Sequence, residues 1–243
     1  MISLMYHYFT LGMFEMLLNE IKKTFEVNCI YDIGAHKGEW TLEYFQKFTA
    51  EYHLFEANPR LPDPLLSGAH WHNVALSSEK GARQFFCRDG TGDSFYRENT
   101  KNYSNESEFM LQVETVKLDH YVFERKLKDP DVIKIDIQGA ELDILSGGLK
   151  CLANSKLVLC EVPVVPFNQG APSFDDYLKF FTMQSFLPAG VDVLHLIDGV
   201  VVQLDIVFVN QSVHKTIIGE SKMLNISAII GQSINHNDKV QVF

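Results

Sequence analysis

Runs of apolar residues alternate with amphipathic segments along most of the chain. Seven short apolar runs predict strands, at Asn28–Ile33, Glu51–Glu56, Trp71–Leu76, Val132–Asp136, Leu157–Glu161, Val191–Ile197 and Val201–Val209. Helical candidates lie between them, at Glu39–Phe48, Leu118–Leu127, Ala140–Leu149 and Phe174–Met183. Strands that alternate with helices predict an α/β fold with a mainly parallel, seven-stranded sheet that is covered on both faces.

Two parts of the chain depart from this alternation. The last two predicted strands are joined by Asp198-Gly199, and Asp-Gly between apolar runs is a strong hairpin signal, so the sheet is expected to end in an antiparallel C-terminal hairpin. Arg83–Cys87 and Met110–Val116 are predicted as extra strands. The segment between them, Arg88–Glu108, is rich in Gly, Asn, Ser and Tyr, and because long loops in compact domains are usually functional we expect it to cover a substrate or cofactor.

The turn after the first predicted strand carries two glycines, Gly34 and Gly38, and a helix follows. Open α/β sheets bind cofactors at such a turn. A dinucleotide site needs Gly-x-Gly-x-x-Gly, whose middle glycine lets a pyrophosphate approach the backbone. Here the middle glycine is missing and Asp32 precedes Gly34 by two residues, which argues against an NAD-binding oxidoreductase. An acid at this position suits a ligand with a cationic amino-acid end, such as S-adenosylmethionine (SAM).

A second acid, Glu56, ends the next predicted strand. An acid there can accept hydrogen bonds from both ribose hydroxyls of a nucleoside cofactor. Taken alone, Asp32 or Glu56 is also explained as a solvated carboxylate at a strand end. The pair, combined with the two glycines, favours a SAM site.

A third motif, Ile-Lys-Ile-Asp-Ile-Gln-Gly-Ala-Glu, covers Ile133–Glu141. It follows Asp-Ile-Gly-Ala-His-Lys-Gly at Asp32–Gly38 and Phe-Glu-Ala-Asn-Pro at Phe55–Pro59. These three segments, in this order, resemble the FkbM family of SAM-dependent methyltransferases, over roughly residues 28 to 210. One departure is Gln138, where family members often carry Glu.

The resemblance implies a Rossmann-like class I methyltransferase and extends the set of residues expected to bind the cofactor. The turn is expected to hold the methionine end of SAM, Glu56 the ribose, and Asn73 to Ala75 the border of the adenine. Ser94 would close over the cofactor. The full set of expected SAM-binding residues is Asp32, Gly34, His36, Gly38, Glu56, Asn73, Ala75, Ser94 and Asp136.

Three residues are candidates for catalysis. Asp136 ends the fourth strand, beside the first, and would act as general base or hold the amino group of SAM; the structural alternative is a cap for the following helix. Glu161 ends the adjacent strand and could approach Asp136 across the cleft. Two such carboxylates can share a hard cation such as Mg²⁺, but no metal site is predicted. His36 is a further base or donor candidate.

Other polar residues have simpler explanations. An acid in the first turn of a helix, such as Glu141, is favourable on dipole grounds alone. His53, His70, His72, His120 and His195 show no ligand spacing and are expected to be ordinary surface or core histidines.

Composition limits the class of protein. The 243 residues carry a net charge of −10 and no basic stripe, so nucleic acid is not an expected partner. The four cysteines form no Cys-x-x-Cys pair, which fits a reducing cytoplasm. We expect three parts: an N-terminal helical extension over residues 1–27, a SAM-dependent methyltransferase domain over 28–210 and a C-terminal extension over 211–243.

The N-terminal extension is apolar at three- and four-residue steps from Leu11 to Ile21. This spacing predicts an amphipathic helix packed on the domain or on a second subunit, which would form a homo-oligomer. Glu15, Asn19 and Glu20 interrupt the apolar run before a bilayer span of ~20 residues, so no transmembrane segment is predicted. Membrane attachment is the alternative.

The expected function is SAM-dependent O-methylation of a hydroxyl. The resemblance implies a sugar or glycan acceptor. A polyketide or lipid hydroxyl is the alternative acceptor, and a non-catalytic SAM-binding module is the alternative class.

Overall fold

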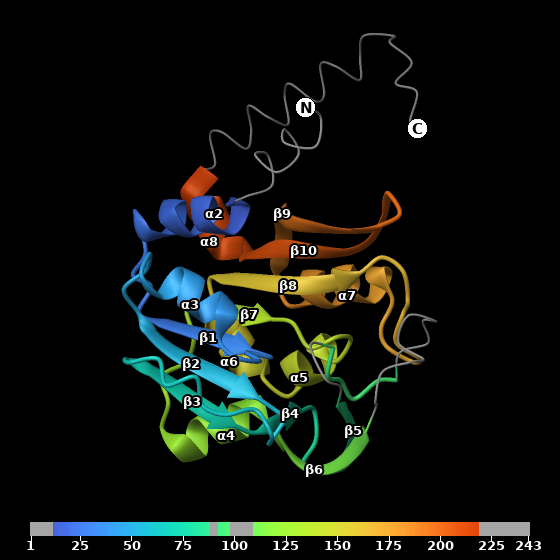
Figure 1. The fold of residues 1–243 in the computed structure, drawn as a ribbon. Coiled ribbons are helices and arrows are strands. Elements are labelled where there is room, and N and C mark those ends of the chain that lie inside the picture. The colour runs from blue at the N-terminus through green and yellow to red at the C-terminus, as the bar shows by residue number, and fades with distance from the viewer. Residues whose placement is uncertain (1–11, 88–91, 98–108, 219–243) are drawn as a thin grey trace, which may run out of the picture.

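The computed structural model describes residues 12–87, 92–97 and 109–218 (Figure 1). The helices are α2 (Met13–Lys22), α3 (Glu39–Phe45), α4 (Leu118–Arg125), α5 (Glu141–Ser146), α6 (Leu149–Asn154), α7 (Phe174–Met183) and α8 (Gln211–Ile218). The strands are β1 (Cys29–Ile33), β2 (Glu51–Glu56), β3 (Ala69–Asn73), β4 (Ala75–Ser77), β5 (Gly81–Cys87), β6 (Phe109–Lys117), β7 (Val132–Ile135), β8 (Leu157–Pro163), β9 (Phe186–Ile197) and β10 (Val200–Asn210).

Seven strands form one sheet in the order β3-β2-β1-β7-β8-β10-β9. The first five in this order are parallel, and β10 pairs antiparallel with both β8 and β9. This confirms the predicted α/β fold with its antiparallel C-terminal hairpin. The carboxyl ends of the five parallel strands therefore meet at one edge, which is where ligands bind in such sheets.

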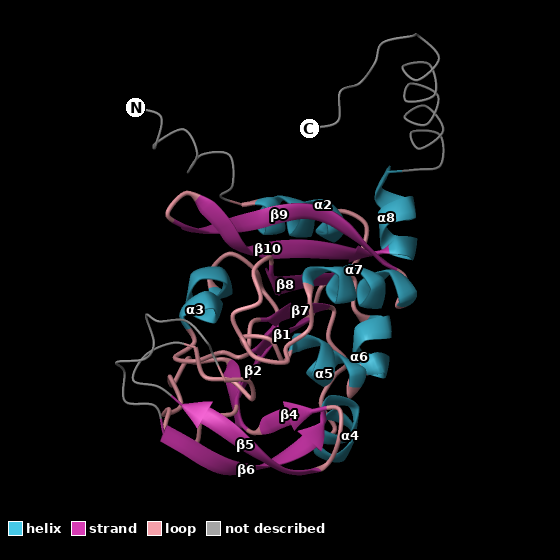
Figure 2. Ribbon diagram, turned by 90° about the vertical axis from the view of Figure 1, so that its right-hand side faces the viewer, coloured by secondary structure: helices cyan, strands magenta, loops and turns pink. Residues whose placement is uncertain are grey.

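The predicted strand Trp71–Leu76 is wrong as a single element. It divides into β3 and β4, and β4 belongs to a second, three-stranded sheet in the order β4-β6-β5 (Figure 2). The division follows from hydrogen bonding, because Val74 N donates to the carbonyl of Glu56 at 2.9 Å and carries the chain past the end of β2. The expected extra strands are confirmed as β5 and β6.

The predicted helix Ala140–Leu149 is also two elements. α5 ends before Gly147 and α6 begins after Gly148. A Cβ on Gly147 would lie 2.2 Å from the carbonyl oxygen of Ser77, and one on Gly148 would lie 2.6 Å from Cδ2 of Leu118. The two glycines thus let this turn pack tightly against its neighbours. α6 overlaps the predicted helix only at Leu149, and α8 lies where no helix was predicted.

The core lies on both faces of the large sheet. One cluster joins the strands to α4, α5, α6 and α7, and the other joins them to α2, α3 and α8. Figure 2 shows α3 on the opposite side of the sheet from α5 and α6. Every residue of β1 is buried, as expected for a strand covered on both faces.

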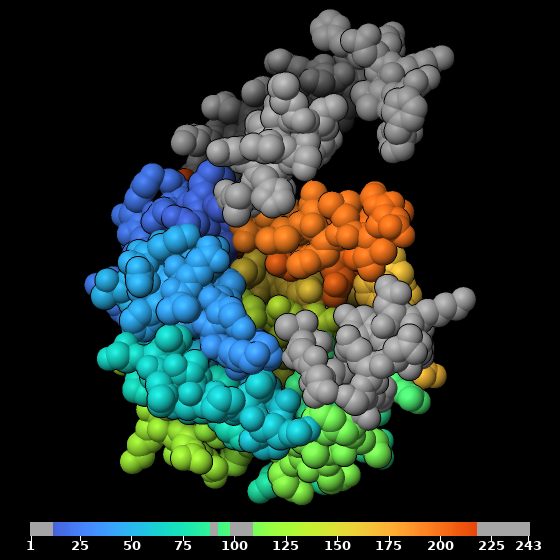
Figure 3. Space-filling view, in the orientation of Figure 1, coloured from blue at the N-terminus to red at the C-terminus, as the bar shows by residue number. Residues whose placement is uncertain are grey.

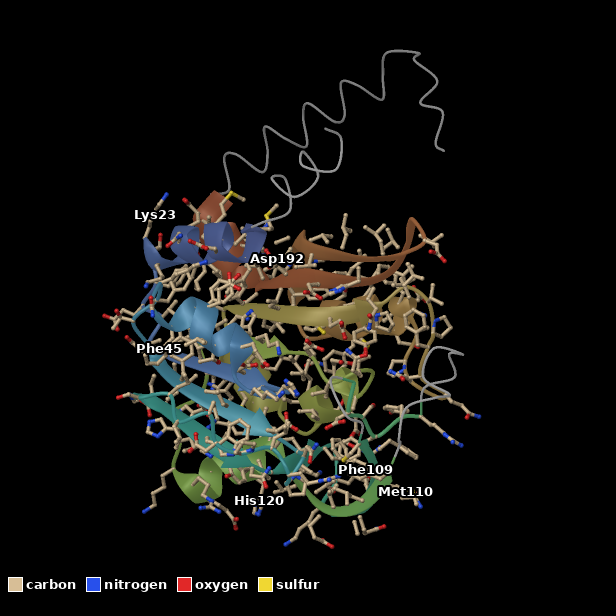
Figure 4. The ribbon with its side chains drawn as sticks, viewed as in Figure 1. Lys23, Phe45, Phe109, Met110, His120 and Asp192 are labelled. Carbon is tan, nitrogen blue, oxygen red and sulfur yellow. The ribbon has the colours of Figure 1, made fainter. Side chains whose placement is uncertain are left out.

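The N-terminal helix packs on the domain, which is one of the two packings expected for it. Phe14, Leu18 and Ile21 of α2 have no exposed surface. The Oδ1 atom of Asp192, on β9, accepts a hydrogen bond from Phe14 N at 2.8 Å (Figure 4). In the part of the chain that the structure describes, no helix is long and apolar enough to cross a membrane. All four cysteines are free and buried.

Candidate active site

A cavity of about 390 Å³ opens at the carboxyl edge of the parallel strands. Its wall includes Gly34 after β1, Glu56 of β2, Asp136 after β7 and Glu161 of β8. Residues 92–95, from the segment between β5 and β6, form part of the opposite wall. A volume of roughly 300–1,000 Å³ is typical of small-molecule sites, so this cavity is large enough for a cofactor.

The turn after β1 is shaped by its first glycine. Gly34 has φ +78°, and a Cβ there would lie 2.0 Å from the carbonyl oxygen of Asp136. The turn therefore packs directly against the end of β7. It also presents the N–H of His36 to Oε2 of Glu56 at 2.9 Å, which joins the first two sequence motifs.

Glu56 is held in one position at the cavity wall. It is 6% exposed, and its second oxygen, Oε1, accepts a hydrogen bond from Asn58 N at 2.7 Å. Burial raises the pKa of Glu56, and the two backbone N–H groups oppose that effect. The result is a fixed carboxylate that lines the cavity.

Of the three residues predicted to border the adenine, Asn73 to Ala75, only Val74 is among those that line the cavity. The Nδ2 group of Asn73 donates to the carbonyl oxygens of Glu56 and Asn58, each at 3.0 Å, so Asn73 holds the loop that follows β2. Val74 lines the cavity. Ala75 is 4% exposed.

Asp32 is not among the residues that line the cavity, and it has no exposed surface. Thr41 Oγ1 donates to its Oδ2 at 2.7 Å, and Lys134 Nζ lies 3.2 Å from its Oδ1. Lys134 also donates to the carbonyl of Gly34 at 3.2 Å and lies 3.7 Å from Oδ2 of Asp136. Asp32 therefore acts on the site through Lys134, a residue that the sequence reasoning missed although it stands in the third motif.

The charge of Lys134 is stabilised by its neighbours. Burial alone would lower the pKa of this amine, but the carboxylates of Asp32 and Asp136 outweigh burial and raise it. The ion pair with Asp32 links β1 to β7, directly beneath the turn that carries Gly34.

Asp136 and Glu161 come together across the cleft, as expected, and Gln138 connects them. Its Nε2 group donates to Oδ1 of Asp136 at 3.3 Å and to Oε2 of Glu161 at 2.5 Å. The backbone carbonyl of Gln138 accepts hydrogen bonds from Ser94 Oγ at 2.8 Å and from Asn168 Nδ2 at 2.6 Å. A neutral amide at this position donates to two carboxylates, whereas a glutamate would add a third negative charge.

Glu161 is strongly affected by its surroundings. It is 7% exposed. Burial, followed by the nearby carboxylate of Asp136, raises the pKa of Glu161 well above its ordinary value. Glu161 therefore retains a proton far more readily than an exposed glutamate does.

The antiparallel hairpin adds a histidine that sequence reasoning did not place in the site. His195 lines the cavity. Its Nε2 lies 3.0 Å from Oδ1 of Asp205 and 4.0 Å from Oε1 of Glu161. The hydrogen bond with Asp205 raises the pKa of His195 and outweighs the effect of burial. A register shift between Val201 and Gln203 pairs His195 with Gln203, and the hairpin turn alone gives no signal for that shift.

Within the described ranges, His195, Asp205 and Glu161 form a group of possible metal ligands. Glu161, His195 and Asp205 offer ligand atoms that all lie within 4.8 Å of one another. The hydrogen bond between His195 and Asp205 explains the short distance between these two residues without an ion.

A second hollow, a groove of about 820 Å³, adjoins the cavity. It runs between α3 and the β9–β10 hairpin, where Figure 3 shows the surface recessed. The groove and the cavity share Gly34, His36, Asp136 and Glu161. Its lining is acidic, with the carboxylates of Glu15, Glu39, Glu43, Asp136, Glu161, Asp192 and Asp205 against the amines of Lys47 and Lys134.

The remaining predicted residues are placed as follows. Gly38 has φ +77° and its Cβ position lies 3.2 Å from Leu54, so it closes the turn against β2. His36 lines both hollows, with Nδ1 3.3 Å from Oε1 of Glu39. Glu141 is 1% exposed and accepts hydrogen bonds from the N–H groups of Ile137 and Gly139. Most of the expected covering loop, Arg88–Glu108, lies outside the described residues.

The sheet order, with the cavity at the carboxyl ends of its parallel strands, is that of the Rossmann-like fold of class I methyltransferases. Residues 32–188, more than half of the chain, match the family model described as the methyltransferase FkbM domain. The chain belongs to this family, as its motifs predicted.

Comparison with individual proteins gives more distant similarities. The chain is 27% identical to the 2-O-methyltransferase NoeI of Sinorhizobium fredii (strain NBRC 101917 / NGR234) over 184 residues, which cover 67% of this chain and 76% of NoeI. The crystal structure of methyltransferase FkbM from Methylobacillus flagellatus KT superposes with a TM-score of 0.47 and 15% identity over 74% of this chain. This chain spans 43% of the length of that protein. Magnesium protoporphyrin IX methyltransferase (ChlM) from Synechocystis PCC 6803, solved with bound SAM, superposes with a TM-score of 0.46 and 7% identity over 81% of this chain and 77% of its own.

Proposed function

We propose that the protein is a SAM-dependent O-methyltransferase that transfers a methyl group to a hydroxyl of a sugar or glycan. The observation that carries this proposal is that two neighbouring hollows share lining residues. A cavity with a fixed carboxylate, Glu56, lies beside an acidic groove, and the two share Asp136 and Glu161. One hollow suits the cofactor and the other suits the acceptor.

The donors and surfaces of the cavity fit SAM. Glu56 offers a carboxylate to the ribose hydroxyls, and the apolar side chains of Val74, Leu76 and Phe85 offer a surface for the adenine. Asp136 offers a carboxylate to the cationic amino-acid end, and the turn at Gly34 and His36 gives that end its backbone contacts. When bound, SAM supplies an electrophilic methyl group on a sulfonium.

Asp32 and Ser94, two further residues expected to bind the cofactor, are proposed to act indirectly. Lys134 neutralises Asp32 and fixes the turn through the carbonyl of Gly34. Ser94, which donates to the carbonyl of Gln138, ties the segment between β5 and β6 to the cavity wall. The first interaction holds the shape of the site, and the second closes its side.

The groove favours an acceptor rich in hydroxyl groups. Its carboxylates accept hydrogen bonds from hydroxyls and repel polyanions. Trp40 and Tyr44 of α3 add aromatic surface beside them. A neutral sugar combines donors with an apolar ring face, and the name of the relative NoeI, a 2-O-methyltransferase, supports a hydroxyl acceptor.

A lipid hydroxyl is the second candidate acceptor. Leu196, Ile197 and Val200 of the β9–β10 hairpin are exposed, and Leu196 lines the groove. An acceptor with an apolar tail would cover these side chains.

Methyl transfer can be tested with labelled cofactor. The protein would be incubated with methyl-labelled SAM and methyl glycosides of glucose, galactose, mannose, fucose and N-acetylglucosamine. The expected result is a glycoside that carries the labelled methyl group on one of its former hydroxyl oxygens. Label recovered only in a fatty alcohol or hydroxy fatty acid would replace the sugar with the lipid acceptor.

A further inference from the structure

The strand order separates the cofactor side of the site from the acceptor side. Glu56 and Gly34 stand at the ends of β2 and β1, and Glu161 stands on β8, two strands beyond β1. Neighbouring strands are about 4.8 Å apart, so β8 lies roughly 10 Å from β1. A group on the β8 side therefore stands apart from Gly34 and Glu56, beside the groove proposed for the acceptor.

His195 and Asp205 form a hydrogen-bonded pair on that side. His195 Nε2 lies 3.0 Å from Asp205 Oδ1, and His195 lines the cavity while Asp205 lines the groove. A carboxylate that accepts from Nε2 holds the imidazole proton there and leaves Nδ1 as the proton acceptor. Both residues come from paired strands, so the imidazole is held by the sheet and not by a loop.

The other candidates are less suited to accept a proton. Glu161 is buried beside the carboxylate of Asp136, and like charges at such close range favour one bound proton. Asp136 already has Lys134 Nζ at 3.7 Å and the amide of Gln138 at 3.3 Å. His36 lines both hollows, but it belongs to the turn after β1, and its Nδ1 already lies 3.3 Å from both carboxylate oxygens of Glu39.

We propose that His195, oriented by Asp205, is the general base of this enzyme. This inference rests on the proposed O-methyltransferase function. The acceptor O–H bond breaks and its proton forms an N–H bond with Nδ1 of His195. The oxygen forms the new bond to the methyl carbon as the carbon–sulfur bond breaks, and the sulfur keeps that electron pair. Asp205 stabilises the imidazolium that results.

The pH dependence follows from the charges that face His195. These are Asp205 on β10, Glu161 on β8 and Asp136 after β7. The hydrogen bond with Asp205 raises the pKa of His195 above its ordinary 6.5. Because the base must be neutral, turnover should rise with pH through that pKa, and Asp205→Asn should move the rise to lower pH.

Three variants of the full chain test the assignment. His195→Gln removes the base, Asp205→Asn removes its orienting carboxylate, and His120→Gln is the matched control because His120 lies on α4 and pairs with Glu124 at 3.2 Å. Each variant would be measured for SAM affinity by calorimetry and for turnover of the methyl glycoside that the wild type uses best. Histidine NMR of the ligand-free protein would give the pKa of His195 in the wild type and in Asp205→Asn.

The expected result is a loss of turnover of ~10²-fold or more in His195→Gln, with SAM affinity within about threefold of wild type. In the NMR experiment, His195 should titrate above 6.5 in the wild type and lower in Asp205→Asn. Turnover of His195→Gln within threefold of wild type would overturn the assignment, and so would a loss of SAM affinity as large as the loss of turnover.

The two proposals can fail separately. A wild type that binds no SAM refutes the proposed function and the base together. A wild type that methylates while His195→Gln keeps its rate refutes the base alone. If the wild type binds SAM and methylates none of the glycosides, the sugar acceptor is refuted, and an unchanged His195 pKa in Asp205→Asn would also refute the orienting pair.

Discussion

Lys134→Met is the substitution that most directly probes how the cofactor turn is supported. Methionine keeps most of the volume of the lysine side chain and removes its positive charge. In the wild type, Lys134 Nζ lies 3.2 Å from Oδ1 of Asp32, which has no exposed surface, and donates to the carbonyl of Gly34. The variant therefore leaves a buried carboxylate without its cation.

The magnitude follows from this burial. Breaking a buried pair by removing one partner costs about 3–5 kcal/mol of unfolding free energy. For a chain of this size each kcal/mol corresponds to about 2–4 °C, so the melting temperature should fall by roughly 6–20 °C. The double variant Lys134→Met with Asp32→Asn should recover much of the loss because it removes the unpaired charge.

Thermal denaturation at pH 7, followed by circular dichroism, measures these differences. Lys150→Met is the matched control, since Lys150 is 67% exposed and its ion pair with Asp129 should contribute about 0–1 kcal/mol. A loss below about 1 kcal/mol in Lys134→Met, comparable to the control, would refute the reasoning that a buried ion pair supports the turn.

Three further predictions concern other parts of the fold. In urea denaturation, Gly34→Ala should destabilise the protein far more than Gly170→Ala. Both glycines have φ near +80°, but of the two only Gly34 has backbone in the way of a Cβ, at 2.0 Å. Equal losses of unfolding free energy, of about 1–2 kcal/mol, would mean that the turn does not pack on β7. Burial, with the neighbouring histidines, lowers the pKa of His72 from 6.5 to about 4. Stability from His72 is therefore full above pH 6.5 and is lost as pH falls toward 4, and His72→Gln should flatten that slope in urea titrations; identical slopes would contradict it. Gln138→Glu should lower the melting temperature more at pH 8 than at pH 5, because a third carboxylate joins Asp136 and Glu161, and a pH-independent effect would contradict that placement.

Much of the large sheet could be predicted from the sequence because β1, β2, β7 and β8 are short, mostly apolar runs that lead into or end at polar motif residues. Glu51–Glu56 and Phe174–Met183 were predicted to the residue. The position of Glu56 at the cavity followed from the rule that ligands bind at the carboxyl ends of parallel strands. These features depend on local patterns and on one topological rule.

The rest of the site depends on contacts between segments far apart in the chain. Lys134 stands inside an apolar strand motif, and only the packing of β7 on β1 shows that it pairs with Asp32. His195 pairs with Gln203 only because the hairpin contains a register shift, and that shift places the imidazole beside Asp205. No local pattern in the sequence reports either contact.

Calorimetry with SAM tests the central claim most directly, namely that the cavity at the ends of β1 and β2 is a SAM site built around Glu56. The wild type should bind SAM and not NADH, and Glu56→Ala should weaken SAM binding by about 1–3 kcal/mol while the protein stays folded. Glu79→Ala, at an exposed position between β4 and β5, is the control and should leave the affinity unchanged. Binding of NADH without binding of SAM at millimolar concentration, or full SAM affinity in a folded Glu56→Ala variant, would contradict the account.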